Sequence, residues 1–253
     1  MGMQTKRIAA PCAALALGVA GFFLRRWELA TGFDQQGLNV PCTAVWVLAA
    51  LSGAVVLAAL IFGLTQKPAS RYYQVFPQST GLALLRLLGA LLVMAGCVIA
   101  LGESTGLFHT IVLLLGAAAG VCLLAGDALY LKGQAPQPWA ELVPVFFLIL
   151  LIIYDFRHWS IDPVVLDYCF RLFALLSCMG FAYAWAGYGF NQGRRKSLCL
   201  FGMLCVFFCV TSLADGQLSQ MLLMGGWALR ALVALGCAAG ASEDPAETDT
   251  DPS

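Results

Sequence analysis

The chain has 253 residues, of which 60% are apolar and only 11% are Asp, Glu, Lys or Arg. A soluble domain is about 45–50% apolar and about 25% charged, so this chain has too few polar side chains to cover a water-soluble globule. The composition excludes a soluble enzyme and a disordered chain, and it predicts an integral membrane protein. Fourteen basic residues balance fourteen acidic ones, which leaves no net charge to attract nucleic acid.

Eight stretches of the chain are apolar enough to be membrane-spanning helices. Such a helix needs about 20 residues to cross the hydrocarbon core. The fifth and seventh stretches have only about 17 residues, so each would span only if nearly upright, and either could instead be a re-entrant segment. The sequence therefore predicts an all-α fold, a polytopic transmembrane bundle of about eight helices. In chain order the stretches are Ile8–Leu24, Thr43–Leu64, Gly81–Leu101, Phe108–Leu131, Pro138–Tyr154, Val164–Tyr188, Ser197–Leu213 and Leu218–Gly240.

Lys and Arg in the short loops predict how the chain is threaded. With a cytoplasmic amino terminus, eight of them lie inside and three outside, in agreement with the positive-inside rule. We therefore expect a bacterial plasma-membrane protein with both termini in the cytoplasm. In an alternative, the first stretch is a signal peptide removed near Ala20, which leaves about seven helices. The inner residues are Lys6, Arg7, Lys67, Arg71, Lys132, Arg194, Arg195 and Lys196, and the outer ones are Arg25, Arg26 and Arg157.

The sequence predicts one domain and a tail. Residues 1–241 form a single helical membrane domain, because the connections are short. Residues 242–253 are acidic and lack large apolar side chains, so we expect a disordered tail. The basic turn at residues 191–196 is expected to contact anionic lipid headgroups. The expected partners are membrane lipids, with another membrane protein as a further candidate and no nucleic acid.

The ten cysteines do not form a recognisable motif. There is no C-x-x-C pair, and only two histidines are present, which is too few for most zinc or haem sites. Cys205 and Cys209 lie one helical turn apart and share a face, where small polarisable side chains are typical of packing. We therefore expect no metal centre and no cofactor.

Three ionisable residues inside the stretches are the candidate substrate-binding site: Asp167, Arg171 and Arg230. Each ionised side chain at the bilayer centre costs about 2.5–3.5 kcal/mol, so such residues often mark a solute path. Arg230 lies near the middle of the last stretch, too deep to reach water easily. Asp167 and Arg171 are four residues apart near the outer end of the sixth stretch and would line an outward-facing pocket.

Each of these residues also has a purely structural explanation. Arg230 would form an ion pair between helices, and Asp167 would form a salt bridge with Arg171. Asp127 and Arg86 both fall near cytoplasmic helix ends, so we expect Asp127 to pair with Arg86 or with Lys132.

Two G-x-x-x-G patterns predict close helix packing. They are Gly116–Gly120 and Gly236–Gly240. Glycine lets two helices approach closely in lipid, and we expect contacts within the chain rather than between subunits.

The segment DFRHWSIDPVVLDY (155–168), with LADG at residues 213–216, resembles a group of uncharacterised multi-pass membrane proteins of clostridial-type bacteria. The resemblance covers the carboxyl-terminal half and implies a membrane helix bundle, with no activity attached.

Three functions remain open at this point. The first is binding or translocation of a small solute or lipid from the outer face, along the three candidate residues. The second is a non-catalytic subunit or assembly partner of a membrane complex. The third is an intramembrane enzyme acting on lipid or envelope precursors, with Glu28, Asp155 and His158 at headgroup depth. No nucleotide-binding loop, zinc-protease motif or serine elbow occurs in the sequence.

Overall fold

The computed structural model describes residues 3–32, 42–69, 71–77, 79–104, 106–134, 137–159 and 165–240, without the side chains of residues 3–7, 159 and 165–167. Within these ranges the chain is helical and contains no strand. Eight helices are long and apolar enough to cross a membrane. This result confirms the predicted all-α bundle and a multi-pass membrane protein.

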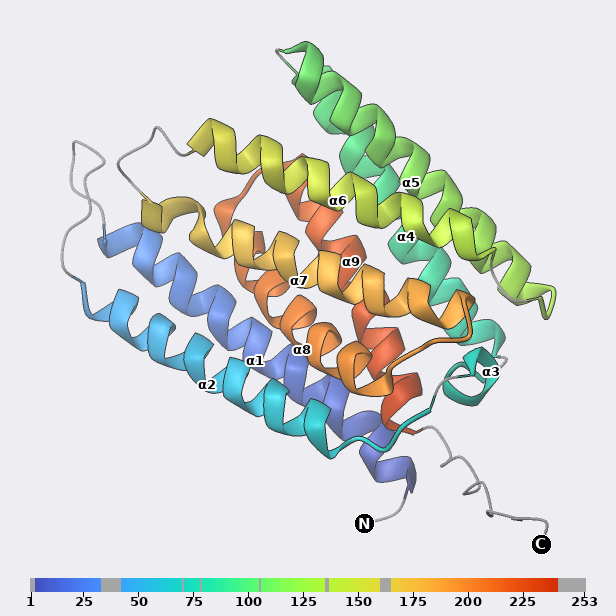
Figure 1. The fold of residues 1–253 in the computed structure, drawn as a ribbon. Helices are drawn as coiled ribbons and strands as arrows, with labels where there is room; N and C mark the ends of the chain where they lie inside the picture. Colours follow the sequence, from blue (N-terminus) through green and yellow to red (C-terminus); the bar gives the residue numbers. More distant parts are fainter. Residues whose placement is uncertain are drawn as a thin grey trace, which may run out of the picture.

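The long helices run back and forth along one bundle (Figure 1). A one-turn helix, α3 (Tyr72–Val75), follows α2, and a short 3-10 turn, η1 (Leu213–Asp215), follows α8. The two described ends of the chain lie at the same end of the bundle, which we call the inner end (Figure 1). The long helices are α1 (Met3–Thr31), α2 (Thr43–Thr65), α4 (Thr80–Gly102), α5 (Leu107–Leu131), α6 (Pro138–Trp159), α7 (Val165–Gly189), α8 (Arg195–Ser212) and α9 (Leu218–Ala239).

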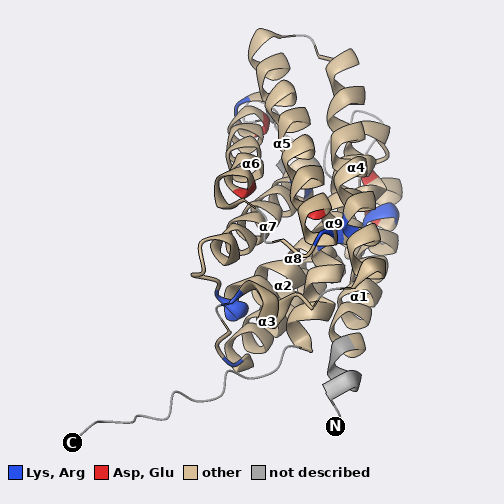
Figure 2. Ribbon diagram, turned by 90° about the vertical axis from the view of Figure 1, so that its right-hand side faces the viewer, with Lys and Arg blue, Asp and Glu red and all other residues tan. Residues whose placement is uncertain are grey.

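The carboxyl-terminal helices form the centre of the bundle. Two thirds (67%) of the most apolar part of α8 and of α9 is buried, against 22% for α1 and α2. Helices α2 and α5 lie at opposite edges (Figure 1). Apolar side chains such as Trp46, Leu57 and Ile61 on α2 are exposed, as expected for a helix that faces lipid on most sides. Charged residues are sparse along the ribbon (Figure 2).

Several helices are longer than predicted, and buried charges explain why. We expected Arg25 and Glu28 in an outer loop, but α1 continues to Thr31 and buries both side chains. An ion pair between them satisfies the charges that would otherwise end the apolar run. Helix α6 likewise reaches Trp159, and α8 with η1 reaches Asp215, so the fifth and seventh predicted stretches are both long enough to span. The predicted acidic tail lies outside the described residues.

Glycines bring the backbone of α4 directly against that of α9. A Cβ atom added at Gly226 would lie 2.6 Å from the Gly89 carbonyl oxygen, and one at Gly96 would lie 2.7 Å from the Ser219 carbonyl oxygen. The two backbones therefore touch with no room for a side chain.

The predicted pair Gly116 and Gly120 also packs within the chain. Added Cβ atoms there would collide with Phe147 on α6 and with Met94 on α4, respectively. The expectation of contacts within the chain is confirmed for this pattern.

Candidate functional site

A cavity of about 160 Å³, lined by both polar and apolar side chains, opens between five helices at the end of the bundle opposite the termini. We call it the outer cavity, because the topology predicted from Lys and Arg places this end of the bundle outside. The carboxyl ends of α4 and α6 and the amino ends of α5, α7 and α9 meet there. Its polar lining consists of Glu103, His109, Tyr154, Asp155, His158, Arg171, Gln217, Ser219 and Gln220.

An ion pair between α6 and α7 forms one wall of the outer cavity. The Arg171 guanidinium donates from Nε to Asp155 Oδ2 at 2.7 Å and from Nη2 to Asp155 Oδ1 at 3.0 Å. Such two-pronged pairs are strong and fix the orientation of both groups. The Asp155 side chain is 1% exposed and that of Arg171 is 16% exposed, so the arginine forms the cavity-facing side of the pair.

Arg171 has a partner that the sequence pattern does not predict. The pattern predicts a bridge to Asp167 one turn away, and the structure shows a bridge from Arg171 to the carboxylate of Asp155 on the neighbouring helix. The side chain of Asp167 lies outside the described residues, so its part in the site stays a prediction.

Stacked rings from α5 and α6 form another part of the lining. The His109 ring lies parallel to that of Tyr154, with centroids 4.2 Å apart, and His158 stacks on the same tyrosine at 5.9 Å. The Ser219 hydroxyl donates to the Glu103 carboxylate at 3.3 Å, which joins α9 to α4 at the cavity mouth. The outer cavity therefore offers one cationic group, carboxylate oxygens and imidazoles to a small molecule.

Arg230 lies in a separate network deeper in the bundle. We call it the inner network, and it consists of Arg86, Asp127 and Arg230. Asp127 on α5 accepts from the Arg230 guanidinium and pairs with Arg86 Nη2 at 2.7 Å. Arg230 also donates to the backbone carbonyl oxygen of Arg86 at 3.1 Å. These contacts confirm that Asp127 pairs with Arg86, and they give Arg230 the expected ion pair between helices.

Aromatic rings complete the shell around the inner network. The Arg86 guanidinium lies 4.4 Å from the Tyr130 ring centroid and 4.5 Å from that of Trp185. Its Nη1 donates to the Tyr72 hydroxyl at 3.2 Å. Burial raises the pKa of Tyr72 to about 12, so the hydroxyl keeps its proton. Rings on several sides partly replace the hydration that the cation loses.

The lining of the outer cavity does not extend to Arg230. On α9 the cavity ends at Leu223, two turns or about 10 Å from Arg230. Arg230 instead lines a void of about 10 Å³ with Glu141, Trp185 and Trp227. Glu141, whose side chain is 4% exposed, cannot be recognised as buried from the sequence because it follows a proline-rich turn. Of the three predicted site residues, the structure thus places Arg171 at the cavity and Arg230 in the inner network.

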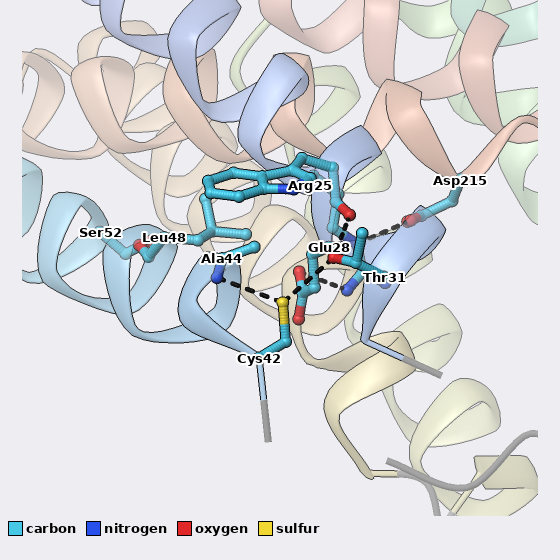
Figure 3. Close-up of polar contacts among 9 residues, drawn as sticks. Arg25, Glu28, Thr31, Cys42, Ala44, Leu48, Ser52 and Asp215 are labelled. Atoms are coloured by element: carbon cyan, nitrogen blue, oxygen red, sulfur yellow. Dashed lines mark hydrogen bonds and ion pairs between the residues drawn. The ribbon is translucent and has the colours of Figure 1, made fainter. Parts of the chain in front are cut away.

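A second buried ion cluster lies where α1 ends (Figure 3). Arg25 donates from Nη1 to Glu28 at 2.9 Å and from Nε to Asp215 at 3.2 Å. Glu28 therefore belongs to this cluster and not to the lining of the outer cavity. The Cys42 sulfur lies nearby, 3.1 Å from the Thr31 hydroxyl, and accepts from the Ala44 amide at 3.3 Å (Figure 3).

The thiol of Cys42 is expected to react at lower pH than an ordinary cysteine. Its pKa lies below the usual value because the Thr31 hydroxyl and the Ala44 amide stabilise the thiolate. Changing Thr31→Val removes one donor, so the pKa should rise and the pH profile of alkylation by iodoacetamide should move to higher pH. Cys42→Ser identifies the signal of this thiol, and an unchanged midpoint in Thr31→Val would show that the hydroxyl plays no part.

The Asp155–Arg171 pair is expected to show strong energetic coupling. Arg171→Met leaves a buried carboxylate without its donors and should lower the free energy of unfolding by about 2–5 kcal/mol. Adding Asp155→Asn removes the stranded charge and should recover part of that loss, with a coupling energy of about 1–3 kcal/mol. Unfolding in mixed micelles with rising dodecyl sulfate measures the free energies of the two single variants and of the double variant. If the losses of the two single variants simply add in the double variant, the pairing is contradicted.

Among the described residues, three buried thiols are arranged so that they could hold a metal ion: Cys178, Cys205 and Cys209. The sequence shows Cys205 and Cys209 on one face of α8 but gives no sign that Cys178 of α7 joins them.

The resemblance of residues 155–168 to clostridial membrane proteins stays a prediction. Comparison of the whole chain with protein families, with curated proteins and with solved structures finds no match.

Proposed function

We propose that this multi-pass protein binds or translocates a small polar solute that enters the outer cavity from outside the cell. In this proposal the protein lies in a bacterial plasma membrane with both termini cytoplasmic, so the cavity faces outward. The observation that carries the proposal is the cavity itself, with a buried ion pair in its wall. Ionisable groups within a membrane protein often mark such a path.

The size and chemistry of the outer cavity limit the solute. Pockets for drug-sized ligands are about 300–1,000 Å³, so a cavity of about 160 Å³ favours a smaller molecule. Arg171 offers positive charge, Glu103 offers negative charge, and Gln217 and Gln220 offer amides. A solute that carries both charges matches this lining better than a simple cation or anion.

The described geometry does not favour the enzyme hypothesis. Both carboxylate oxygens of Asp155 accept from Arg171, which makes this acid a poor proton acceptor. Glu28 pairs with Arg25 in the other cluster. The acids suggested for catalysis at headgroup depth therefore do not converge on one reacting position.

Labelling of an introduced thiol tests the proposal. Because the native Cys97 also lines the cavity, the background carries both Cys42→Ser and Cys97→Ala. In this background Gln220→Cys places a thiol in the cavity wall, and Val98→Cys places one on an exposed apolar face of α4 as a control. Charged methanethiosulfonates added to intact cells should modify only the first. The same result would show that the cavity opens to the outside of the cell.

Competition then identifies the class of solute. Glycine, a zwitterion, should slow modification of Gln220→Cys more than acetate or ethylammonium does, and adding Arg171→Met should abolish the protection. If the thiol is modified but none of the three compounds slows the reaction, the solute-binding proposal is wrong. Absence of modification from either side of the membrane would show that the cavity is closed to water.

A further inference from the structure

Three buried thiols and a thioether meet where α7, α8 and α9 pack together. The Cys178 sulfur lies 3.2 Å from that of Cys209 and 3.5 Å from that of Cys205. The sulfurs of Cys205 and Cys209 are 3.8 Å apart, and all three residues are fully buried. We call these three residues the thiol cluster. The Met224 sulfur of α9 lies 3.9 Å from that of Cys209.

The spacing of the thiol cluster matches what a metal ion needs. Metal–sulfur bonds of about 2.3 Å hold sulfurs about 3.8–4.0 Å apart, depending on whether the ion has four or three ligands. The Cys205–Cys209 distance of 3.8 Å lies within this range, and the two distances from Cys178 are shorter than it by about 0.3–0.8 Å. Binding of an ion would therefore require the Cys178 sulfur to move outward by less than an ångström.

The donor atoms select the kind of ion. Thiolate and thioether sulfur favour soft ions, of which Cu(I) takes three sulfur ligands readily, whereas hard ions such as Mg²⁺ and Ca²⁺ need oxygen. The group of possible ligands contains no histidine or carboxylate. A monovalent ion that displaces one thiol proton also leaves the net charge of the site unchanged, which matters because charge is costly inside a bilayer.

We propose that the thiol cluster, with Met224 beside it, is a binding site for one Cu(I) ion. One thiol binds as the thiolate and releases its proton, and the other two sulfurs complete the coordination. Copper keeps its oxidation state, so no electron donor or acceptor is required. The site is distinct from the outer cavity, whose lining includes none of these four residues.

Ordinary core packing is the competing explanation, and the chain supplies its own control. Cys199 lies on α8, is fully buried, and is not part of the thiol cluster. If cysteines serve only as small apolar side chains here, Cys199→Ser and Cys205→Ser should have similar effects on every property. If the thiol cluster is a copper site, Cys205→Ser should weaken copper binding and Cys199→Ser should not.

Copper counting on the purified full-length protein tests the proposal. Because the thiol cluster is fully buried, the protein is loaded in two ways: during synthesis in copper-supplemented medium, and after purification with Cu(I) under reducing conditions. Bicinchoninate then competes for the ion. We expect one copper per chain by mass spectrometry of the metal, with sulfur-only coordination by X-ray absorption.

The variants decide between the site and non-specific uptake. Cys178→Ser and Cys205→Ser should each lower the affinity at least tenfold, Met224→Leu should lower it less, and Cys199→Ser should leave it unchanged. Failure to retain copper by both loading routes overturns the proposal. The proposal is also overturned if Cys199→Ser loses as much copper affinity as the thiol-cluster variants, or if the protein retains zinc in preference to copper. Elution as a monodisperse peak in detergent confirms that each variant is folded.

Discussion

Asp127→Asn should be the most damaging single change of charge in the described part of the chain, with a loss of about 3–5 kcal/mol in the free energy of unfolding. Asp127 is fully buried and is the counter-ion of both Arg86 and Arg230. The asparagine amide is neutral, so two buried guanidiniums would lose their negative partner at once. Unfolding by dodecyl sulfate in mixed micelles measures the loss.

Two further variants separate charge balance from packing. Arg230→Leu keeps the Arg86–Asp127 pair, so it should cost less than Asp127→Asn. The double variant with Asp127→Asn and Arg230→Leu should be more stable than Asp127→Asn alone, because Arg86 is then the only cation of the inner network left without its acid. Arg26→Gln, at an exposed side chain of α1, serves as the control and should change little. A full retention of stability and solute protection in Arg230→Leu would show that this residue lines no working path.

Gly226→Leu should prevent correct folding, and Gly226→Ala should lower stability by about 1–3 kcal/mol or more. The methyl group of alanine would lie 2.6 Å from the Gly89 carbonyl oxygen and 2.8 Å from the Val93 amide nitrogen. Both are backbone atoms, so neither can rotate away as a side chain would. The two helices would have to separate along the interface that joins the outer cavity to the inner network.

The adjacent glycine is a matched control. An added Cβ at Gly225 has open space around it, so Gly225→Ala should be neutral or stabilising, since alanine favours a helix over glycine by about 1 kcal/mol. The fraction of monodisperse protein after heating compares the two alanine variants directly. Equal behaviour of Gly225→Ala and Gly226→Ala would refute the close approach of α4 and α9.

The sequence predicts the number and order of the helices because apolar runs of the required length are a local property. It predicts the pairing of Arg86 with Asp127 from their similar depth at helix ends. It does not predict that α1 extends through Arg25, since the partner Asp215 lies 190 positions later in the chain. The sequence also does not predict the bridge from Arg171 to Asp155, because the helical repeat shows only partners on the same helix.

The packing glycines illustrate a further limit. Gly89, Gly96 and Gly226 do not form a G-x-x-x-G pattern, yet they allow the backbones of two long helices to touch. Pattern searches on one helix cannot show that Gly89 and Gly226 face each other, because that depends on how α4 and α9 are aligned. The gathering of Cys178 with two cysteines of α8 is unpredictable for the same reason.

The placement of the ion pairs has a consequence for how the chain enters the membrane during synthesis. Arg86 and Asp127 lie on the successive helices α4 and α5, and Asp155 and Arg171 on α6 and α7. A hairpin of two such helices can leave the translocon with its opposite charges already neutralised, which avoids much of the insertion penalty of about 2.5–3.5 kcal/mol per ionised residue. Arg230 lies on the last long helix, so its partner Asp127 on α5 has been synthesised before it. The order of the helices thus gives Arg86, Arg171 and Arg230 each an acid on a helix made close in time or already in place.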